Sequence, residues 1–300
     1  MSDIEITHFP VEKGSLMNGQ PPKTTAYICQ TCGTQFPPAA HPPSRCPICE
    51  DERQYVGWQG QQWTTLEALQ QDHHNVIRAV EPGLTGIGTS PSFSIGQRAL
   101  LVQTPGGNVL WDCITLIDQA TIAEVKALGG ISAIAISHPH YYSSMIEWSR
   151  AFNAPIYLHA ADREWVVRPD PAVIFWVGET RTLADGLTLV RCGGHFSGGT
   201  VLHWPAGAGG KGVLLTGDII NVVQDRRYVS FMYSFTNLIP LSPAAVRRVV
   251  AAVEPFAYDR IYSAWWDKVT LQDARQAVHR SADRYIALIE QDEPVGYQHD

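Results

Sequence analysis

The stretch ISAIAISHPHYYSS, residues 131–144, limits the possible folds of this chain more than any other segment. It begins as an apolar run without polar alternation, which is typical of a strand buried on both faces of a sheet. It ends with His138 and His140. Residues two apart in an extended backbone point to the same side, and α/β folds place their sites at strand ends. We therefore expect both imidazoles to face one ion.

Two further segments carry polar residues at the ends of apolar strands. His195 lies in CGGHFSGGT, where flanking glycines allow a tight turn after the strand GLTLVRC. Asp218 ends the apolar run VLLTGD. Three imidazoles and one carboxylate are a ligand set that suits zinc. The sequence therefore predicts a metal site formed by His138, His140, His195 and Asp218.

The segments ISHPHYYSS, GGHFSGG and LLTGD, in this order, resemble the motifs of the metallo-β-lactamase-fold hydrolases over residues 80–290. The resemblance implies an α/β fold, a four-layer αβ/βα metallo-β-lactamase-like sandwich. It implies that His138, His140 and His195 bind the first metal of the family. It also implies that Asp218 matches the carboxylate that usually bridges two metals.

The chain departs from the family motif at the second metal. Tyr142 and Ser143 stand where the family has Asp and His, and the place of the closing His holds Trp265, Trp266 and Asp267. We therefore expect one metal in this site, with Asp267 as an alternative ligand. A phenol is a poor base at neutral pH, so we predict that Tyr142 donates a hydrogen bond to an oxyanion and that Asp218 acts as base or ligand.

These residues predict a metallo-β-lactamase-like hydrolase with a mononuclear metal centre. Metal-bound hydroxide would attack an ester, lactone or amide-type small molecule. An alternative is a non-catalytic descendant of the fold that binds a metal or ligand, which the lost Asp and His favour. A third hypothesis is an iron-dependent redox protein.

Four cysteines form a second predicted metal site. Cys29, Cys32, Cys46 and Cys49 read C-x2-C-x13-C-x2-C, and two such pairs complete a tetrahedral shell of four sulfurs. The knuckles YICQTCG and RCPICE resemble the rubredoxin-like and zinc-ribbon families. We expect structural zinc here, with iron as an alternative. The metal would replace the hydrophobic core that so short a segment cannot form.

The pattern along the chain predicts four segments. They are an N-terminal arm (1–26), the rubredoxin-like or zinc-ribbon module (27–56), a linker helix (57–79) and the metallo-β-lactamase-like domain (80–300). We expect the linker helix to start at a cap on Thr64 or Thr65. A capping box of Thr121 and Glu124 predicts another helix, and Thr270 is expected to cap the last one.

Composition limits the partners. The net charge of −7 disfavours nucleic-acid binding through a broad basic surface. We find no apolar run long enough to span a membrane and no secretory signal at the N-terminus. The cysteine usage fits a reducing, cytoplasmic setting. We therefore expect a small-molecule substrate or ligand and no nucleic-acid or membrane partner; aromatic residues near the site make a homodimer contact an open alternative.

Overall fold

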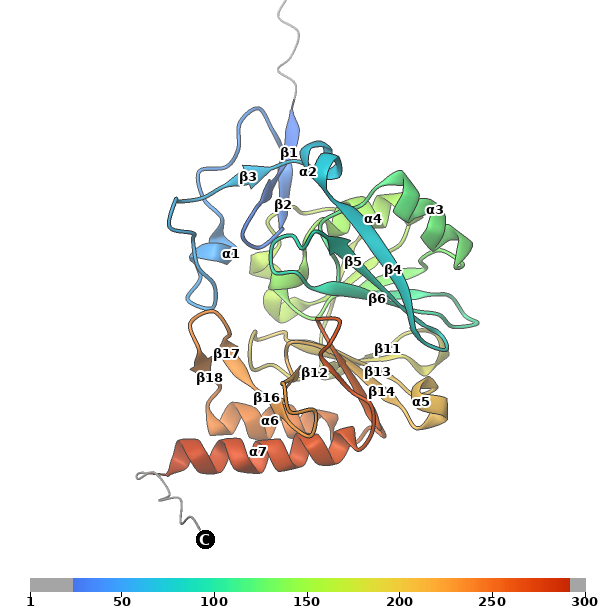
Figure 1. Ribbon diagram of the computed structural model, residues 1–300, viewed down its shortest axis with the longest axis vertical. Helices are drawn as coiled ribbons and strands as arrows, with labels where there is room; N and C mark the ends of the chain where they lie inside the picture. The colour runs from blue at the N-terminus through green and yellow to red at the C-terminus, as the bar shows by residue number, and fades with distance from the viewer. Residues whose placement is uncertain (1–23, 292–300) are drawn as a thin grey trace, which may run out of the picture.

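The computed structural model describes residues 24–291, so most of the predicted N-terminal arm lies outside the described residues. Two β-sheets face each other, and helices cover the outer face of each sheet (Figure 1). This is the four-layer αβ/βα sandwich that the sequence predicted. The small cysteine module lies at one side of the sandwich, next to both halves (Figure 1).

The first sheet has seven strands in the order β10-β9-β8-β7-β6-β5-β4. Its strands are β4 (His74–Glu81), β5 (Leu84–Ser90), β6 (Arg98–Val102), β7 (Val109–Trp111), β8 (Ala133–Ala135), β9 (Ile156–His159) and β10 (Val173–Trp176). Helices α3 (Gln119–Ala127) and α4 (Met145–Phe152) pack on its outer face through one buried apolar cluster. The strands from β7 to β10 are parallel, so the residues that follow them meet at one edge.

The second sheet has six strands in the order β11-β12-β13-β14-β19-β20. Its strands are β11 (Thr180–Thr182), β12 (Thr188–Arg191), β13 (Thr200–Trp204), β14 (Val213–Gly217), β19 (Arg260–Ser263) and β20 (Val269–Thr270). Helices α6 (Pro243–Val253) and α7 (Ala274–Glu290) cover its outer face. Two small hairpins extend from it, β15 (Asn221–Val222) with β16 (Val229–Ser230), and β17 (Met232–Ser234) with β18 (Ile239–Pro240).

A third apolar cluster fills the space between the sheets. It includes Leu100, Trp111, Leu202 and Leu215, all buried. At roughly 25 cal/mol per Å² of apolar surface, this interior is the main favourable contribution to holding the two halves together. The strand ends that carry the predicted ligands are therefore fixed relative to each other by the core beneath them.

The cysteine module contains a three-stranded sheet in the order β2-β1-β3 and one short helix. Its elements are β1 (Thr25–Cys29), β2 (Gln35–Ala39), α1 (Pro47–Glu50) and β3 (Trp63–Thr64). Its buried cluster continues into the sandwich, where Ile95, Trp165 and Val167 pack against it. The module therefore shares its apolar interior with the body of the protein.

The predicted linker helix over 57–79 is wrong beyond a short segment. Helix α2 spans only Leu66–Asp72, with the Thr65 side chain accepting from the Ala68 N–H at 3.1 Å. The following residues form β4, which pairs antiparallel with β5 and is the edge strand of the first sheet. Cross-strand pairing of β-branched Val76 and Ile77 outweighs the helical tendency of the preceding residues.

Two predicted helix starts are also corrected. Asp118, rather than Thr121, caps α3 by accepting from the Thr121 N–H at 2.7 Å. Thr270 lies in β20, and the last helix begins only at Ala274. The pairing of β20 with β19 holds Thr270 in the sheet, which sequence spacing alone does not reveal.

Candidate metal centre

The first two ligands follow β8 of the first sheet. His138 has an extended backbone, and Pro139–Tyr141 then form one 3₁₀ turn that carries His140. Ser137 supports this segment: its N–H donates to Asp112 Oδ1 at 2.7 Å, and its hydroxyl lies 2.9 Å from His138 Nδ1. A hydrogen bond at Nδ1 orients the ring and leaves Nε2 free for an ion.

The other two ligands come from the second sheet. His195 follows β12 in a loop where Gly193 and Gly194 have positive φ. Asp218 follows Gly217, the last residue of β14, whose φ is +54°. A Cβ at Gly217 would lie 2.6 Å from Ser137 Oγ, so only glycine allows the two sheets to approach here.

The four predicted ligands form one buried group. One donor atom from each of His138, His140, His195 and Asp218 lies within 4.8 Å of the others. His138 Nε2 is 3.3 Å from Asp218 Oδ1, and His140 Nδ1 is 3.1 Å from His195 Nε2. The sequence placed these four residues at the ends of three strands, and the structure brings all four together.

The protonation states favour cation binding. Burial lowers the pKa of each of the three imidazoles, so they are neutral and offer lone pairs. Burial raises the pKa of Asp218, while His195 and the Tyr141 hydroxyl act in the opposite direction. A cation at this point would stabilise the carboxylate and the lone pairs together.

The donor set fits a metal ion. His138 Nε2, His140 Nε2 and Asp218 Oδ1 are buried and have no hydrogen-bond partner among the described residues. Buried polar atoms are almost always paired in folded proteins. Nitrogen and carboxylate oxygen donors at this spacing suit zinc, so His138, His140, His195 and Asp218 would hold it.

The residues that replace the second-metal ligands face elsewhere. The Tyr142 hydroxyl lies 3.5 Å from the carbonyl oxygen of Asp162, and Tyr142 does not line the cavity beside the metal centre. This placement does not fit the oxyanion role that we predicted for Tyr142. Ser143 Oγ donates to the Cys113 carbonyl at 3.3 Å and accepts from Gln97 at 3.1 Å. Both side chains are therefore engaged in the interior.

The region of the closing histidine also offers no further ligand. The Trp265 indole N–H donates to the Ile95 carbonyl at 3.2 Å, and its ring lines the cavity beside the metal centre. Asp267 lines a different cavity and lies outside the ligand group, so it does not act as the alternative ligand. Within residues 24–291, His138, His140, His195 and Asp218 are thus the full candidate set at this centre.

A cavity of about 320 Å³ opens onto His140, His195 and Asp218. Its walls come from both halves of the sandwich and from the cysteine module, for which the sequence predicts only a structural role. The other lining residues are Thr31, Arg53, Gln54, Tyr55, Ser94, Ile95, Phe235, Thr236 and Trp265. The module therefore forms one wall of the candidate active site.

Arg53 connects the cysteine module to the metal centre, and the sequence analysis missed it. Its Nη1 donates to the carbonyl oxygen of His195 at 3.1 Å. Its guanidinium carbon lies 3.8 Å from the ring centroid of Phe196, within cation–π range. Asp51 binds the remaining side of the guanidinium. Arg53 follows the last cysteine of the cage, but no sequence pattern links it to residue 195.

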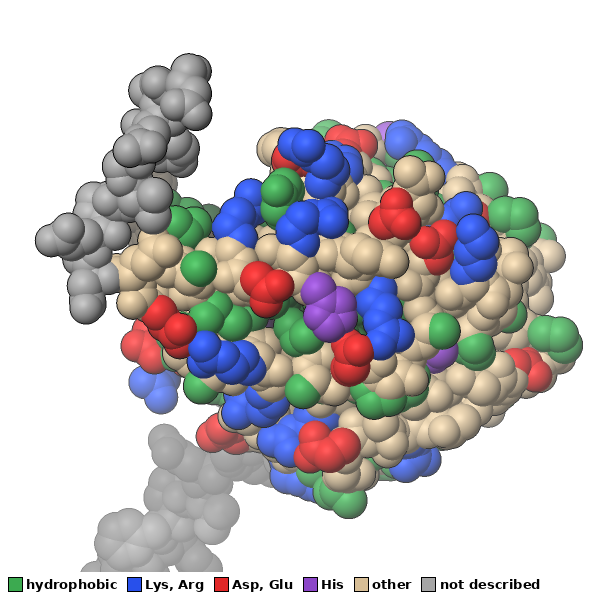
Figure 2. Space-filling view, turned by 90° about the horizontal axis from the view of Figure 1, so that it is seen from below, with side chains coloured by type: hydrophobic (Ala, Val, Ile, Leu, Met, Phe, Trp, Pro, Cys, Tyr) green, Lys and Arg blue, Asp and Glu red, His purple; other side chains and the backbone are tan. Residues whose placement is uncertain are grey.

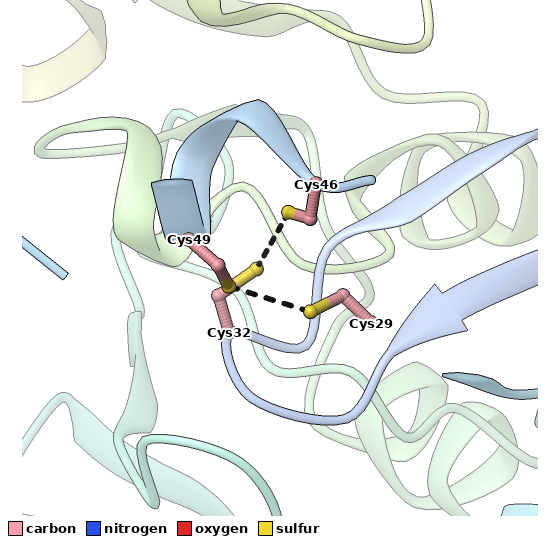
Figure 3. Close-up of side chains that lie close together, drawn as sticks. All are labelled: Cys29, Cys32, Cys46 and Cys49. Atoms are coloured by element: carbon pink, nitrogen blue, oxygen red, sulfur yellow. Dashed lines mark hydrogen bonds between the residues drawn. The ribbon is translucent and has the colours of Figure 1, made fainter. Parts of the chain in front are cut away.

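The four cysteines form the second group (Figure 3). All are buried, with Cys29 Sγ 3.4 Å from Cys49 Sγ and Cys32 Sγ 3.7 Å from Cys46 Sγ. Hydrogen bonding from Cys32 lowers the pKa of the Cys29 thiol, and Gln61 Nε2 donates to Cys29 Sγ at 3.1 Å. Four sulfurs at this spacing fit one tetrahedral ion, with no position left open.

Protein-family models and curated proteins give two different results for this chain. No family model matches the chain. The uncharacterized protein YmaE of Bacillus subtilis (strain 168) is 53% identical over 265 residues, which cover 88% of this chain and 96% of YmaE.

No helix within residues 24–291 combines the length and apolar character that a membrane-spanning helix needs.

Solved structures agree on the fold. The crystal structure of VMB-1 at pH 5.5 has a TM-score of 0.53 at 13% identity and covers 72% of this chain and 98% of its own. The metallo-β-lactamase FIM-1 from Pseudomonas aeruginosa, in its mono-zinc form, has a TM-score of 0.53 at 15% identity, with coverages of 71% and 96%. DIM-1 metallo-β-lactamase exposed to ceftazidime reaches 0.52 at 14% identity, with coverages of 71% and 98%. The chain has the metallo-β-lactamase fold, and by its sequence it belongs to the family of Bacillus subtilis YmaE.

Proposed function

We propose that this protein is a metal-dependent hydrolase with one metal ion at the histidine centre. Its substrate would be an ester, lactone or amide-type small molecule. The observation that carries the proposal is the buried group of His138, His140, His195 and Asp218, of which three members line a cavity of about 320 Å³. The mono-zinc form of FIM-1 supports the idea that this fold accommodates a single zinc ion.

The residues of the site would have separate roles in catalysis and in substrate binding. A zinc ion bound here supplies a Lewis acid that polarises a carbonyl group and lowers the pKa of water. Asp218 is the one carboxylate of the ligand group, so it either binds the ion or takes the proton from the attacking water. Tyr55, Phe235 and Trp265 line the cavity with aromatic surface, which suits an apolar or ring-bearing substrate.

Surface charge supports a small-molecule substrate over a nucleic acid. The net charge is −7, and Lys and Arg side chains are interspersed with Asp and Glu on the face shown in Figure 2. A polyanion needs a continuous basic surface to neutralise its phosphates. We therefore propose a small molecule, and not a nucleic acid, as the substrate.

The test is elemental analysis of the purified protein beside the double variant His138→Ala/His140→Ala. We expect about two ions per chain in the wild type and about one in the variant. A matched control is His41→Ala/His74→Ala, which removes two exposed histidines and should keep both ions. A panel of esters, lactones and amides is then assayed with all three proteins.

The outcomes separate the hypotheses. Hydrolysis by the wild type and the control, but not by the His138/His140 variant, supports the proposal. Two ions without turnover of any substrate favours a non-catalytic ligand-binding descendant, for which Tyr142 and Ser143 in place of the usual second-metal ligands are the motivating observation. A wild type with only the cysteine-bound ion contradicts a metal centre at the histidines.

A further inference from the structure

A second cavity, of about 820 Å³, adjoins Trp265, and the proposed function does not use it. Trp265 lines both cavities. Three cationic side chains, Arg98, Arg226 and Lys268, line the second cavity beside a single carboxylate, that of Asp267. Its cationic character contrasts with the net charge of −7 for the whole chain.

Arg98 is the unusual residue of this cavity. Only 2% of its surface is exposed, and its Nε and Nη2 have no hydrogen-bond partner within residues 24–291. Arg98 forms no ion pair among the described residues; Asp267 and Tyr262 act to raise its pKa, but the effect of burial is larger. Burial lowers the pKa of Arg98 to about 10. An arginine buried without a hydrogen-bond or ion-pair partner is costly. Because Arg98 lines this cavity, an anion bound there would supply that partner.

The structure holds Arg98 firmly in place. It is the first residue of β6, and its backbone N–H donates to the Ala264 carbonyl at 2.8 Å. Its guanidinium carbon lies 5.2 Å from the ring of Trp266, and that of Arg78 lies 4.9 Å from the same ring. A rigid fork of donors beside an aromatic face is suited to a planar or tetrahedral oxyanion.

Glycines of β5 make room for the aromatic wall. A Cβ at Gly86 would lie 2.7 Å from the Trp266 ring, and one at Gly88 would lie 2.8 Å from its Nε1. Gly88 is also the cross-strand partner of Arg98. The two glycines therefore allow the indole to lie flat against the sheet, next to the arginine, so the wall and the cation are built together.

We propose that this cavity binds a small organic anion, with its carboxylate or phosphate group on Arg98 and its apolar part against Trp266, Val269 and Leu271. Lys268 and Arg226 would neutralise a second negative charge. This site is separate from the metal centre, and the inference stands whether or not the protein is a hydrolase.

The test is calorimetric titration of the full chain with sodium benzoate and, separately, with inorganic phosphate at constant ionic strength. We expect the wild type to bind at least one of them, and Arg98→Met to bind it roughly tenfold to a hundredfold more weakly, as for loss of a charged hydrogen bond. Lys268→Met, whose backbone contacts are unaffected, should weaken binding as well. The control Arg247→Met removes an exposed cation of α6 and should bind as the wild type.

The two ligands distinguish the chemistry. Benzoate binding alone indicates an organic carboxylate, and phosphate binding indicates a phosphate-bearing ligand; either supports the site if Arg98→Met weakens it. If neither anion binds the wild type at millimolar concentration, or if Arg98→Met binds like the control, Arg98 does not hold an anion and the proposal is wrong. Thermal unfolding of Arg98→Met without ligand verifies that this variant folds.

Discussion

The cysteine cage and the histidine centre are both buried groups of four metal-binding side chains, yet they differ in construction. The cage takes its four sulfurs from residues 29–49, two from each local knuckle. The histidine centre takes its donors from residues 138–218, at strand ends of two different sheets. The cage would enclose an ion on all sides, whereas the histidine centre adjoins a cavity. The first arrangement suits a structural ion and the second suits chemistry.

The two sites are nevertheless in contact. Arg53, shortly after the last cysteine, donates to the carbonyl of His195, and the backbone carbonyl of Arg53 accepts from Ser234 at 3.1 Å. Asn237 donates to the carbonyls of Glu52 and Gln54 at 2.9 and 3.2 Å. The cysteine module therefore positions a wall of the cavity, in addition to stabilising its own segment.

The largest effect is expected from breaking the cage. Cys32→Ser should release about one ion per chain and lower the free energy of unfolding by several kcal/mol, because structural zinc in small modules is coupled to folding. Limited proteolysis should then cleave within residues 27–56. The histidine centre should still bind an ion, since its four donors all lie in the sandwich, but with the weaker affinity expected when the Arg53 contact to His195 is lost.

The control for the cage is Cys192→Ser. Cys192 is buried in the core beside α6, and its Sγ lies 3.7 Å from the Val190 carbonyl. This variant should keep both ions. If Cys32→Ser lost the ions of both sites, the histidine centre would depend on the cage, and the distinction between a structural and a separate catalytic ion would fail.

A smaller effect is expected at the contact between the sites. Arg53→Lys keeps the charge but loses the paired contacts to Asp51 and His195 and the stacking on Phe196. We expect metal affinity at the histidine centre to fall tenfold to a hundredfold, as is typical when a support of a ligand is lost. Competition with a chelator measures this change. Arg45→Lys, at an exposed arginine of the same module, should leave the affinity unchanged.

The smallest effect is expected at Asp162, which supports the His195 loop by accepting from the Gly198 N–H at 2.7 Å. Burial raises the pKa of Asp162 to about 6. The folded state favours the protonated carboxyl group, so Asp162 contributes its full stabilisation below about pH 4. This stabilisation is lost as the pH rises through about 6 and the group ionises. Asp162→Asn keeps the acceptor and removes this loss. Relative to wild type, it should gain roughly 1–3 kcal/mol between pH 4 and pH 7.

Denaturant unfolding across this pH range measures the difference between Asp162→Asn and the wild type. Asp72→Asn, which removes an exposed carboxylate at the end of α2, should follow the wild-type curve. If the free energy of unfolding changed with pH equally in Asp162→Asn and the wild type, Asp162 would have the same pKa in the folded and the unfolded chain. That result would contradict the prediction.

Local spacing allowed much of this protein to be predicted. The two C-x-x-C pairs bring four sulfurs together within a short segment, and the apolar runs before His138, His195 and Asp218 predict buried strands. The ends of the strands in such a fold meet at one edge. The position of each predicted ligand directly after a strand therefore predicts that the four ligands lie together. The turn PGG at residues 105–107 likewise predicts the antiparallel pairing of β6 with β7.

Other features of the structure depend on tertiary contacts and could not be predicted from local spacing. Residues 74–81 form a strand because β5 offers a partner, and the Tyr142 hydroxyl points to the Asp162 carbonyl because of the packing around it. The contact of Arg53 with residue 195 and the burial of Arg98 beside Trp266 join residues far apart in the chain. Spacing along the chain determines which side chains share a turn or a strand end. The burial and the pairing of residues far apart in the chain contribute free energy only when the sheets pack against each other.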